Sequence, residues 1–569
     1  MDRPVISASA TSMLQPTGSI RLGDLLRDHG LLSPVQLAYA LQKQHIEGQK
    51  LGSLLVQHGL ALEYDVAKVL AGQRGTEFVK ADDLPAPDHA VLELFNNELC
   101  LAHGFLPLRR RGQQVEVLLG DGDPAAIAEL VMRRCGLPCH FLQGEFTRVA
   151  QLTRQSYYFA QNPVEDLIRR EIKVLGEDVD HAYSPERLLD LLLHLAVRER
   201  ATDVHITPSA TSLHVLLRID GVLRPMLALP PMLARILVFV KLTAEMDISE
   251  QRRPQDGSFQ TRVLDMPYTV RVSTIVTEYG ERLVLRLLPE RSDLTGLAQL
   301  GFRPEDVAVL KRVFERPAGL VLVTGPTGSG KSTTLHAALR LQSLIERNVL
   351  TVEDPIEYRV PGAGQTEVNR RAGYEFSTAL RHFLRHDPDV MLIGEIRDGE
   401  TAQAAIESAA TGHLVLSTLH VSSVFGVVPR LRPLGLDAQS IADNLVAVIN
   451  QRLVRRNCPV CSVPVAPDAA TAAWLADYPD AAPQRGCGCD TCRGTGYLGR
   501  LPAYEILQVD QALANAIADD RGREAIHKLA HDSGFRPMVE MAKWMVAQGR
   551  TTPEEVLRVV GDGPAGAQS

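Results

Sequence analysis

The spacing of apolar residues changes along the chain, and each change predicts a different class of structure. Near the N-terminus apolar residues recur every three or four positions, in the stretches 21–44 and 50–73, which is the period of amphipathic helices. After about residue 183, runs such as SLHVLLRIDGVL alternate with period two between glycine-containing turns, which favours strands of a mixed sheet. After residue 296, uninterrupted apolar runs such as GLVLVT alternate with helical segments, which predicts a doubly wound α/β domain.

The two helical stretches are copies of one motif. RLGDLLRDHGLLSPVQLAYALQKQ starts at residue 21 and KLGSLLVQHGLALEYDVAKVLAGQ starts at residue 50, 29 residues later. Each copy is predicted to form a short helix, a glycine-terminated turn and a second helix. Packing of two helical hairpins explains the leucines, whereas the recurring polar positions favour a pseudo-twofold surface. The recurring positions include Arg21, Leu22, Gly23, Gln44, Lys50, Leu51, Gly52 and Gln73.

Changes in composition divide the 569 residues into domains, since a chain of this length is too long for one hydrophobic core. We expect an N-terminal regulatory or docking domain at 1–150 and a charged helical linker at 151–182. A mixed α+β domain is expected at 183–295. The remainder, 296–569, is expected to hold the doubly wound domain, a cysteine-rich insert at 455–500 and a helical C-terminal tail.

The charge and hydropathy of the chain narrow the classes of partner. Lys and Arg number 60 against 68 Asp and Glu, so the formal net charge is −8 and no global positive field indicates a nucleic-acid polymer. The N-terminal sequence MDRPVISASATSMLQPTGS has no apolar core of signal-peptide length, and apolar stretches such as RILVFV are far shorter than a membrane span. We therefore expect a cytoplasmic chain that reaches a membrane only through a partner.

A glycine-rich turn between a strand and a helix predicts a phosphate-binding loop. GPTGSGKSTT, at 325–334, fits the template G-x-x-x-x-G-K-[ST]. Glycines let successive backbone N–H groups point at phosphate oxygens, Lys331 adds a positive charge, and the Ser332 hydroxyl can ligate Mg²⁺. The residues expected to bind nucleotide are Gly325, Pro326, Thr327, Gly328, Ser329, Gly330, Lys331, Ser332 and Thr333.

Two acidic segments follow strands of the same domain. In NVLTVEDPIEY the acidic groups come at the end of an apolar run, where open α/β sheets form their ligand crevice, although a solvated acidic turn would have the same composition. DPDVMLIGEIRD ends its strand at Gly394, where many P-loop enzymes carry a Mg²⁺-binding aspartate. Glu395 is the candidate to orient or deprotonate the attacking water.

Two histidines bracket a further apolar strand, HLVLSTLH. A lone histidine beside a strand is more often structural. Because His413 and His420 flank a candidate nucleotide site, a phosphate-sensing role stands open beside the structural one.

Five of the eight cysteines crowd between residues 458 and 492. Two C-x-x-C pairs separated by residues 462–488 offer four thiolates, the ligand set of structural Zn²⁺. Cys487 is an alternative ligand. The predicted ligands are Cys458, Cys461, Cys489 and Cys492, and we expect small apolar core residues at Cys100, Cys135 and Cys139.

Taken in order, these strings resemble the type II (general) secretion ATPases, with the type IV pilus assembly ATPases as near relatives. The resemblance covers roughly residues 185–560 and includes GQTEVN, TGHLVLSTLH, QRLVRR and CDTCRGTGYLGR. It implies an α/β fold with a RecA-like P-loop ATPase domain, preceded by the mixed α+β domain and the N-terminal helical-repeat domain, with a tetracysteine zinc insert. It also implies a homo-hexameric, ATP-hydrolysing motor that powers pseudopilus assembly and protein export across the outer membrane.

The resemblance assigns roles to individual residues. It implies an Asp box of Glu353, Asp354 and Glu357, a Walker B glutamate at Glu395, and a His box of His413 and His420. The strings RVS and VLRLL single out Arg271 and Arg286, which would complete the site from the preceding domain. Second-rank candidates are Arg381, Arg385 and Arg397. The turn VSSVFG departs from the Asn-containing turn of relatives after STLH.

The N-terminal repeat resembles the bipartite domain through which certain secretion and pilus ATPases bind cyclic di-GMP. The five-residue spacer matches, while Lys50 for Arg and Val66 for Leu depart from that pattern. In other type II ATPases the equivalent domain only docks on the cytoplasmic part of an inner-membrane platform protein, which would make this chain peripheral at the inner membrane. The alternatives are a type IV pilus assembly ATPase and a cyclic di-GMP-sensing nucleotide-binding protein with little hydrolysis.

Overall fold

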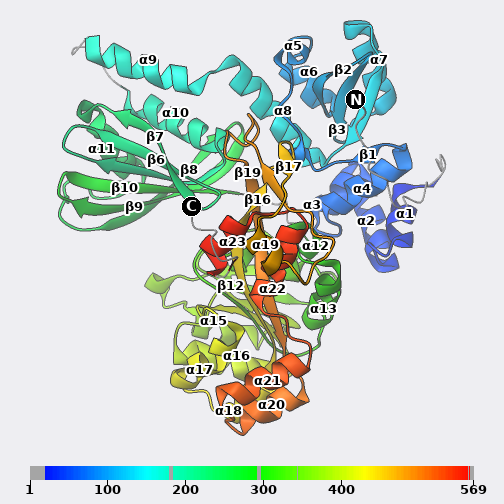
Figure 1. Cartoon of the computed structure of the whole chain (residues 1–569), viewed down its shortest axis with the longest axis vertical. Coiled ribbons are helices and arrows are strands. Elements are labelled where there is room, and N and C mark those ends of the chain that lie inside the picture. The colour runs from blue at the N-terminus through cyan, green and yellow to red at the C-terminus, as the bar shows by residue number, and fades with distance from the viewer. Residues whose placement is uncertain (1–19, 178–183, 291–295, 343, 562, 564–569) are drawn as a thin grey trace. The chain divides into compact units, whose positions relative to one another are not determined.

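The structure is a computed structural model that describes residues 20–177, 184–290, 296–342, 344–561 and 563. The N-terminal stretch read for a signal peptide, the end of the predicted linker and the predicted boundary near 295 lie outside these residues. The chain divides into two compact units, Met1–Tyr157 and Tyr158–Ser569 (Figure 1). No helix of the described ranges is both long and apolar enough to cross a bilayer.

The N-terminal repeat forms two helical pairs, as predicted. Each pair turns at a glycine with φ of +68°, Gly30 or Gly59, a conformation that residues with a side chain rarely adopt. The turns are closed alike, by Leu31 N–H donating to Leu26 O (2.9 Å) and Leu60 N–H donating to Leu55 O (2.8 Å). The helices are α1 (Leu22–Asp28), α2 (Pro34–Glu47), α3 (Leu51–Gln57) and α4 (Glu63–Arg74).

A small α/β subdomain completes the first unit. Its four-stranded sheet has the order β1-β4-β3-β2. Cys100 is fully buried and its thiol lies 3.3 Å from the Tyr157 hydroxyl, while Cys135 and Cys139 are half-buried. The elements are β1 (Glu77–Phe78), η1 (Ala81–Asp83), α5 (His89–Leu92), α6 (Asn97–His103), β2 (Phe105–Arg111), β3 (Gln114–Leu119), α7 (Pro124–Cys135), β4 (Cys139–Gln143) and α8 (Phe146–Gln161).

The second unit opens with a six-stranded sheet of order β7-β6-β5-β10-β9-β8. All of its strand pairs are antiparallel, so the expectation of a mixed sheet was wrong. Short turns between consecutive strands impose antiparallel pairing on four of the five pairs, whereas β5 and β10 are far apart in the chain. One face is apolar and packs on α10 and α11. The elements are α9 (Val164–Glu177), α10 (Pro185–Arg198), β5 (Ala201–Pro208), β6 (Leu213–Ile219), β7 (Val222–Leu229), η2 (Pro231–Ala234), α11 (Arg235–Thr243), β8 (Gln255–Val263), β9 (Met266–Thr277) and β10 (Gly280–Pro289).

The predicted doubly wound domain has a seven-stranded sheet of order β13-β12-β14-β15-β11-β16-β19, parallel except for β19. Successive residues of β11 (Gly319–Thr324) alternate between two hydrophobic cores, one on each face of the sheet. Its other strands are β12 (Val349–Glu353), β13 (Gly364–Glu367), β14 (Val390–Ile393), β15 (Leu414–Leu419), β16 (Leu445–Asn457) and β19 (Tyr497–Gln508). A central strand buried on both faces explains the unbroken apolar run GLVLVT.

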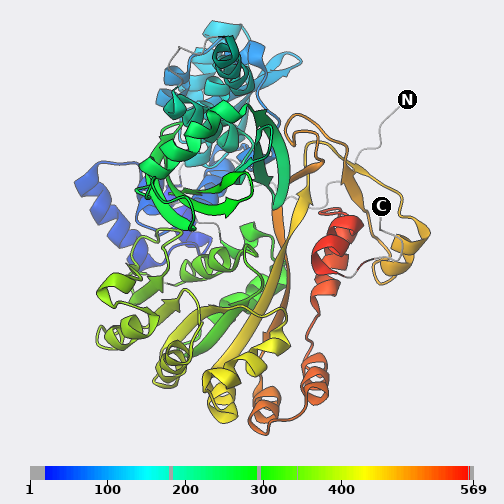
Figure 2. The same ribbon diagram turned by 90° about the vertical axis from the view of Figure 1, so that its left-hand side faces the viewer.

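Helices cover both faces of this sheet and form the C-terminal part of the chain. They are α12 (Leu297–Leu300), α13 (Pro304–Phe314), α14 (Lys331–Leu339), η3 (Arg370–Ala372), α15 (Phe376–Phe383), α16 (Gly399–Ala410), η4 (Val424–Gly426), α17 (Val427–Leu431), η5 (Arg432–Leu434), α18 (Ala438–Asn444), α20 (Gln511–Ala518), α21 (Arg523–Asp532), α22 (Met538–Ala547) and α23 (Pro553–Val560). Figure 2 shows β16 continuing beyond the sheet into the cysteine-bearing insert. That insert contains β17 (Ser462–Pro464), α19 (Ala469–Trp474) and β18 (Gln484–Gly486).

Candidate nucleotide site and metal centre

The loop between β11 and α14 has the backbone that a phosphate-binding loop requires. Gly325, Gly328 and Gly330 have φ angles of +136°, +75° and +85°, in the region open to glycine. A Cβ on Gly325 would lie 2.3 Å from the Gln451 carbonyl oxygen. The glycines are therefore required both for the turn and for the close approach of β16.

The Lys331 side chain folds back onto this loop. Its Nζ donates to the carbonyls of Gly325 and Pro326, each at 3.0 Å, and the residue is 9% exposed. Burial lowers the pKa of Lys331, while the carboxylates of Glu395 and Glu357 act in the opposite direction. The structure thus brings these three predicted site residues into one electrostatic neighbourhood.

Gln451 supports the loop, a role that the sequence did not reveal. It is 1% exposed on β16. Its Nε2 donates to Ser329 O (2.7 Å), and its Oε1 accepts from the Thr334 hydroxyl (2.9 Å). The string QRLVRR begins with this residue, but a glutamine in a strand says nothing by itself about which loop it contacts.

Glu395 lies just after β14, between the side chains of Arg397 and His420. Arg397 Nη2 lies 2.5 Å from Glu395 Oε1, and His420 Nε2 lies 3.5 Å from Oε2. Burial, then the Lys331 charge, lower the pKa of His420, while Glu395 opposes them. The Thr418 hydroxyl donates to the Gly394 carbonyl (2.8 Å), which fixes the backbone that presents Glu395.

The structure does not bring the two histidines together. His420 follows β15 at the carboxyl ends of the parallel strands, on the side of the P-loop. His413 precedes β15, and its carbonyl accepts from Gly319 N–H at the start of β11 (3.1 Å). Its ring contacts Ser408 O (2.9 Å). Within this chain the two histidines lie at opposite ends of a six-residue strand, as the bracketed sequence HLVLSTLH predicted, and only His420 lies near Glu395.

The acidic segment after β12 divides among three environments. Glu353 turns inward, is 4% exposed, and accepts from the Thr351 hydroxyl (2.7 Å) and Gln365 Nε2 (3.0 Å). Asp354 pairs with Arg370 at 2.6 Å. Glu357 is exposed, and its carboxylate is the one in this segment that favours the charged form of Lys331.

His336, on the P-loop helix, is a second residue that the sequence analysis missed. Its Nδ1 lies 2.7 Å from Ser332 O, and its Nε2 lies 3.0 Å from Glu353 Oε2. The second contact is an ion pair, and Nε2 makes no hydrogen bond of standard geometry. Buried histidines beside a Walker A serine are not part of the P-loop template, so only the fold could identify this one.

The predicted arginines occupy different surroundings. Arg271 and Arg286 lie directly opposite each other on β9 and β10. Arg286 is 56% exposed, and its Nε donates to Asp203 Oδ1 (2.9 Å). Of the second-rank candidates, Arg397 contacts Glu395, whereas the other two contact helical neighbours: Arg381 with Glu400 (3.1 Å) and Arg385 with His382 (2.7 Å).

Four cysteines form a compact cluster. The Sγ atoms of Cys458, Cys461, Cys489 and Cys492 all lie within 4.8 Å of one another. Backbone N–H groups of Cys489 (3.1 Å) and Gly496 (3.3 Å) donate to Cys492 Sγ, as in thiolate knuckles around zinc. The donor set fits tetrahedral Zn²⁺. Cys487 is exposed and lies outside the cluster.

The recurring glycines of the N-terminal repeat lie where α1 and α3 cross. A Cβ on Gly23 would lie 2.8 Å from Leu37 Cδ1 and 3.2 Å from Leu51 Cδ2, and a Cβ on Gly52 would lie 3.1 Å from Val66 Cγ1 and 3.5 Å from Leu22 Cδ2. Each glycine thus packs against an aliphatic side chain of its own copy and against the leucine of the other. The Leu-Gly pairs have a packing role, independent of any ligand.

The recurring glutamines are also used symmetrically. Gln73 Nε2 donates to Ile20 O (2.8 Å), and Gln44 Nε2 donates to Gln49 O (3.0 Å). Each glutamine therefore holds the residue that precedes the other copy. Lys50 Nζ contacts Asp121 at 2.9 Å.

The chain is similar to known proteins over most of its length. A family model described as "Type II/IV secretion system protein" matches residues 178–558. Type II secretion system protein E of Aeromonas hydrophila is 43% identical over 379 residues, which cover 66% of this chain and 75% of that protein. Type IV pilus assembly ATPase PilB of Thermus thermophilus is 36% identical over 532 residues, which cover 90% of this chain and 59% of PilB. This chain therefore matches less than two thirds of the length of PilB.

The chain also aligns with a solved structure. The X-ray structure of the ATPase DotB of Legionella pneumophila aligns with a TM-score of 0.49 and 22% sequence identity. The alignment covers 67% of this chain and 96% of that chain.

Proposed function

We propose that this chain, which belongs to the type II/IV secretion system protein family, is an ATP-hydrolysing motor of type II protein secretion. The observation that carries the proposal is the convergence of Lys331, Glu395 and Glu357 on one glycine-rich loop. Hydrolysis would drive domain rotations that assemble a pseudopilus and export proteins across the outer membrane. The active form would be a homo-hexamer in the cytoplasm, bound to the inner membrane through a platform protein.

The residues of the P-loop would hold the substrate. Backbone N–H groups of the loop and the Lys331 ammonium would bind the phosphates of ATP, and the Ser332 hydroxyl would ligate Mg²⁺. When bound, Mg²⁺ supplies positive charge that neutralises the phosphate oxygens. Lys331 would exchange its two carbonyl contacts for phosphate oxygens, which are stronger acceptors.

Glu395 would act on the attacking water. Its carboxylate sits after β14, facing the P-loop side of the sheet, and Arg397 and His420 fix its position. A carboxylate held in this way can orient water and accept its proton. His420 would sense the terminal phosphate, because its imidazole is close enough to Lys331 for the charges there to change its pKa.

Arg271 and Arg286 would supply further positive charge to the transferring phosphoryl group. Both lie on the polar face of the antiparallel sheet, and Arg286 has an exposed guanidinium. Arginine forks stabilise spread phosphate charge well. Nucleotide-dependent closure of the two domains, within one chain or between neighbouring chains, would bring them to the site.

The N-terminal repeat would dock on the platform protein and bind cyclic di-GMP. The support is the pseudo-twofold recurrence of basic residues, Arg21 and Lys50, at the starts of α1 and α3. A dinucleotide with two guanines and two phosphates has matching symmetry. Calorimetry on the whole chain should give micromolar or tighter binding that Arg21→Ala abolishes and the neighbouring Arg27→Ala leaves intact. If the folded chain binds the platform protein but does not bind cyclic di-GMP, the repeat has only the docking role.

Two experiments test the proposed motor: an assay of ATP hydrolysis and the identification of its membrane partner. The purified oligomer should hydrolyse ATP with Mg²⁺, and membrane capture should retrieve components of a secretion platform. A type IV pilus assembly ATPase is the second candidate, favoured by the 90% coverage of this chain by PilB, and capture of pilus components would decide for it. Tight nucleotide binding with negligible turnover in the assembled oligomer would favour a cyclic di-GMP-sensing protein.

A further inference from the structure

One face of the six-stranded sheet carries a row of charged side chains, one from each of four neighbouring strands. Residues directly opposite each other on adjacent strands share a face of the sheet. Arg271 of β9 lies opposite Arg286 of β10. Asp203 of β5 lies opposite Arg286 on one side and opposite Arg218 of β6 on the other. The alternate residues of these strands point into the apolar core, so three guanidiniums and one carboxylate share the polar face.

Asp203 is the buried member of this row, at 4% exposed. Its Oδ1 accepts from Arg286 Nε (2.9 Å), and its Oδ2 accepts from the Thr202 hydroxyl (2.7 Å). Arg218 Nε lies 3.7 Å from Oδ2. Both oxygens of the carboxylate are therefore engaged within the protein, and Asp203 acts on other side chains.

The contact through Nε determines which part of the Arg286 guanidinium stays free. The side chain is 56% exposed, and within the described part of the chain neither of its Nη groups has a hydrogen-bond partner. Because the guanidinium is planar, a bond at Nε fixes its plane and leaves the two Nη groups as a fork. A fork of this kind binds two oxygens of one phosphate group.

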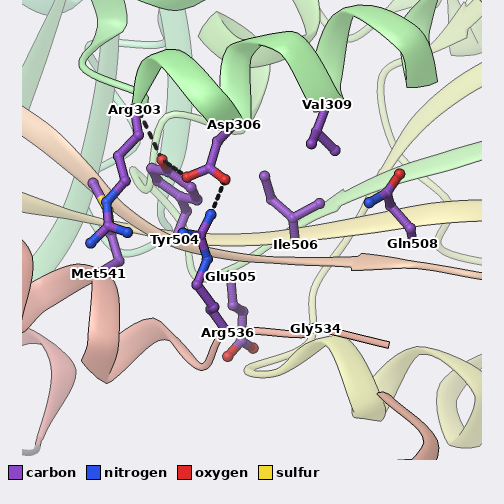
Figure 3. A pocket seen from close by; sticks show the side chains of 10 residues that line it. All are labelled: Arg303, Asp306, Val309, Tyr504, Glu505, Ile506, Gln508, Gly534, Arg536 and Met541. Carbon is purple, nitrogen blue, oxygen red and sulfur yellow. Dashed lines mark hydrogen bonds and ion pairs between the residues drawn. The ribbon is translucent and has the colours of Figure 1, made fainter. Parts of the chain in front are cut away.

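A second buried carboxylate, in the ATPase domain, is arranged differently. Asp306 lines a cavity of about 270 Å³ beside β19 and accepts from the Tyr504 hydroxyl (2.6 Å) and from Arg536 Nη2, as Figure 3 shows. Arg536 Nη1 lies 3.8 Å from Glu305, so both Nη groups of this arginine lie near carboxylates of α13. Arg536 thus joins two parts of the protein, whereas Arg286 leaves its Nη groups to an acceptor from outside the chain.

Stability alone does not account for the position of Asp203. An ion pair with an exposed guanidinium adds little to stability, and burial of a carboxylate has a desolvation cost. Arg271 and Arg286 lie directly opposite each other, where like charges repel. The repulsion favours orientations in which the two guanidiniums turn apart, whereas the contact with Asp203 holds Arg286 in one direction.

We propose that Asp203 is a positioning residue for ATP hydrolysis, which fixes the guanidinium of Arg286 so that its Nη fork meets the transferring phosphoryl group when the domains close. The inference rests on the proposed role of Arg286. Misplacement of a group by about 1 Å can cost about 10²-fold in rate. An Arg286 that keeps its charge but loses its direction should therefore be a poor catalyst.

Turnover of the full-length oligomer tests this role. Asp203→Asn keeps the shape of the side chain but removes its charge, and should lower kcat for ATP about tenfold or more, with KM for ATP within about twofold of the parent. In an Arg286→Ala background the same substitution should cause no further loss of kcat, because the group that it positions is absent. Parent-like kcat in folded Asp203→Asn, or an equal fold-loss in the two backgrounds, overturns the proposal.

Two further variants separate positioning from folding. Asp306→Asn removes the other arginine-bound carboxylate and should lower the melting temperature with kcat unchanged. If it lowers kcat by the same factor as Asp203→Asn, the loss reflects general destabilisation and the proposal fails. Thr202→Val removes the hydroxyl that holds Asp203 Oδ2, and should give a smaller loss of kcat that is also absent without Arg286.

Failure of this inference is distinct from failure of the function on which it rests. A parent oligomer that does not hydrolyse ATP would contradict the proposed motor. Hydrolysis by Arg286→Ala at the parent rate would contradict the role of that arginine, and with it the role of Asp203. A slow Arg286→Ala beside a parent-like Asp203→Asn would contradict the positioning role alone.

Discussion

His336 and Glu353 form a buried ion pair that joins the P-loop helix to the strand carrying the Asp box. The two side chains are 2% and 5% exposed, and their charged atoms lie 3.0 Å apart. Burial opposes a charged imidazole, but Glu353 outweighs it and raises the pKa of His336. Each ring nitrogen lies within 3.0 Å of an oxygen, Nδ1 of Ser332 O and Nε2 of Glu353 Oε2, which suits an imidazolium. The pair therefore fixes the turn that presents the Ser332 hydroxyl.

Removing one member of this pair should be costly. His336→Leu leaves a buried carboxylate without its counter-charge, and we expect a loss of about 3–5 kcal/mol in the free energy of unfolding of the ATPase domain. The double variant His336→Leu with Glu353→Gln should recover part of that loss, because no buried charge remains. Denaturant unfolding of the parent, His336→Leu, Glu353→Gln and the double variant measures the coupling. A loss in the double variant equal to the sum of the two single losses would show that the two residues are not coupled.

Substitutions of Lys331 and Glu395 should affect ATP binding and ATP hydrolysis differently. Glu395→Gln keeps the shape of the side chain but removes the base, so it should bind ATP at near wild-type affinity and lose about 10²-fold or more in turnover. Lys331→Ala should weaken nucleotide binding itself. Equilibrium binding of a fluorescent ATP analogue and steady-state phosphate release measure the two effects. Wild-type turnover in Glu395→Gln would exclude this glutamate as the group that acts on water.

Arg286 should affect turnover far more than stability. Its guanidinium is 56% exposed, so Arg286→Ala should barely change the melting temperature but should slow hydrolysis in the oligomer. Arg262→Ala, an exposed arginine of the same sheet on β8, is the matched control and should hydrolyse ATP normally. If the two variants turn over ATP equally fast, Arg286 has no role at the phosphoryl group.

The cysteine cluster should hold one Zn²⁺ per chain. Cys458→Ser should abolish bound zinc and expose the insert to protease, because few large apolar side chains stabilise this segment. Cys487→Ser, outside the cluster, should retain the metal. Metal analysis after gel filtration distinguishes the two. If Cys458→Ser retains its full zinc content, these four thiols are not the zinc ligands.

Glu555 should make the C-terminal helix α23 sensitive to acid. The carboxylate is fully buried and accepts from Arg455 and Arg558 at 2.6–2.9 Å. Burial alone would raise its pKa, but the two guanidiniums outweigh burial and lower it from its ordinary value of 4.5. The stabilisation is therefore complete above about pH 4.5 and is lost as pH falls through the lowered pKa.

A matched pair of variants tests this pH dependence. Glu555→Gln should lose about 1.5–3 kcal/mol of stability at neutral pH and show a smaller further loss below pH 4.5. The exposed Glu524→Gln on α21 should follow the parent at every pH. Melting curves between pH 3 and pH 7 measure both. An acid response of Glu555→Gln identical to that of the parent would rule out this carboxylate as its cause.

The sequence alone was sufficient to predict a feature wherever the residues of one segment determine its structure. The period of apolar residues and the turn glycines Gly30 and Gly59 predicted the helical pairs, because backbone geometry at a turn depends on the residue that occupies it. The P-loop residues and the four clustered cysteines were found from spacing alone, since the spacing is what lets one loop surround a phosphate or one knuckle present two thiolates.

Relationships between distant segments were decided only by the tertiary structure. The sequence placed His413 and His420 at the two ends of one strand, but only the direction of β15 in the sheet shows that His420 lies beside Glu395 and that His413 lies beside the start of β11. Gln451 under the P-loop and the partner of His336 depend on which strands are neighbours in the sheet. Strand order follows from burying apolar faces across the whole domain, so no local stretch of sequence contains it.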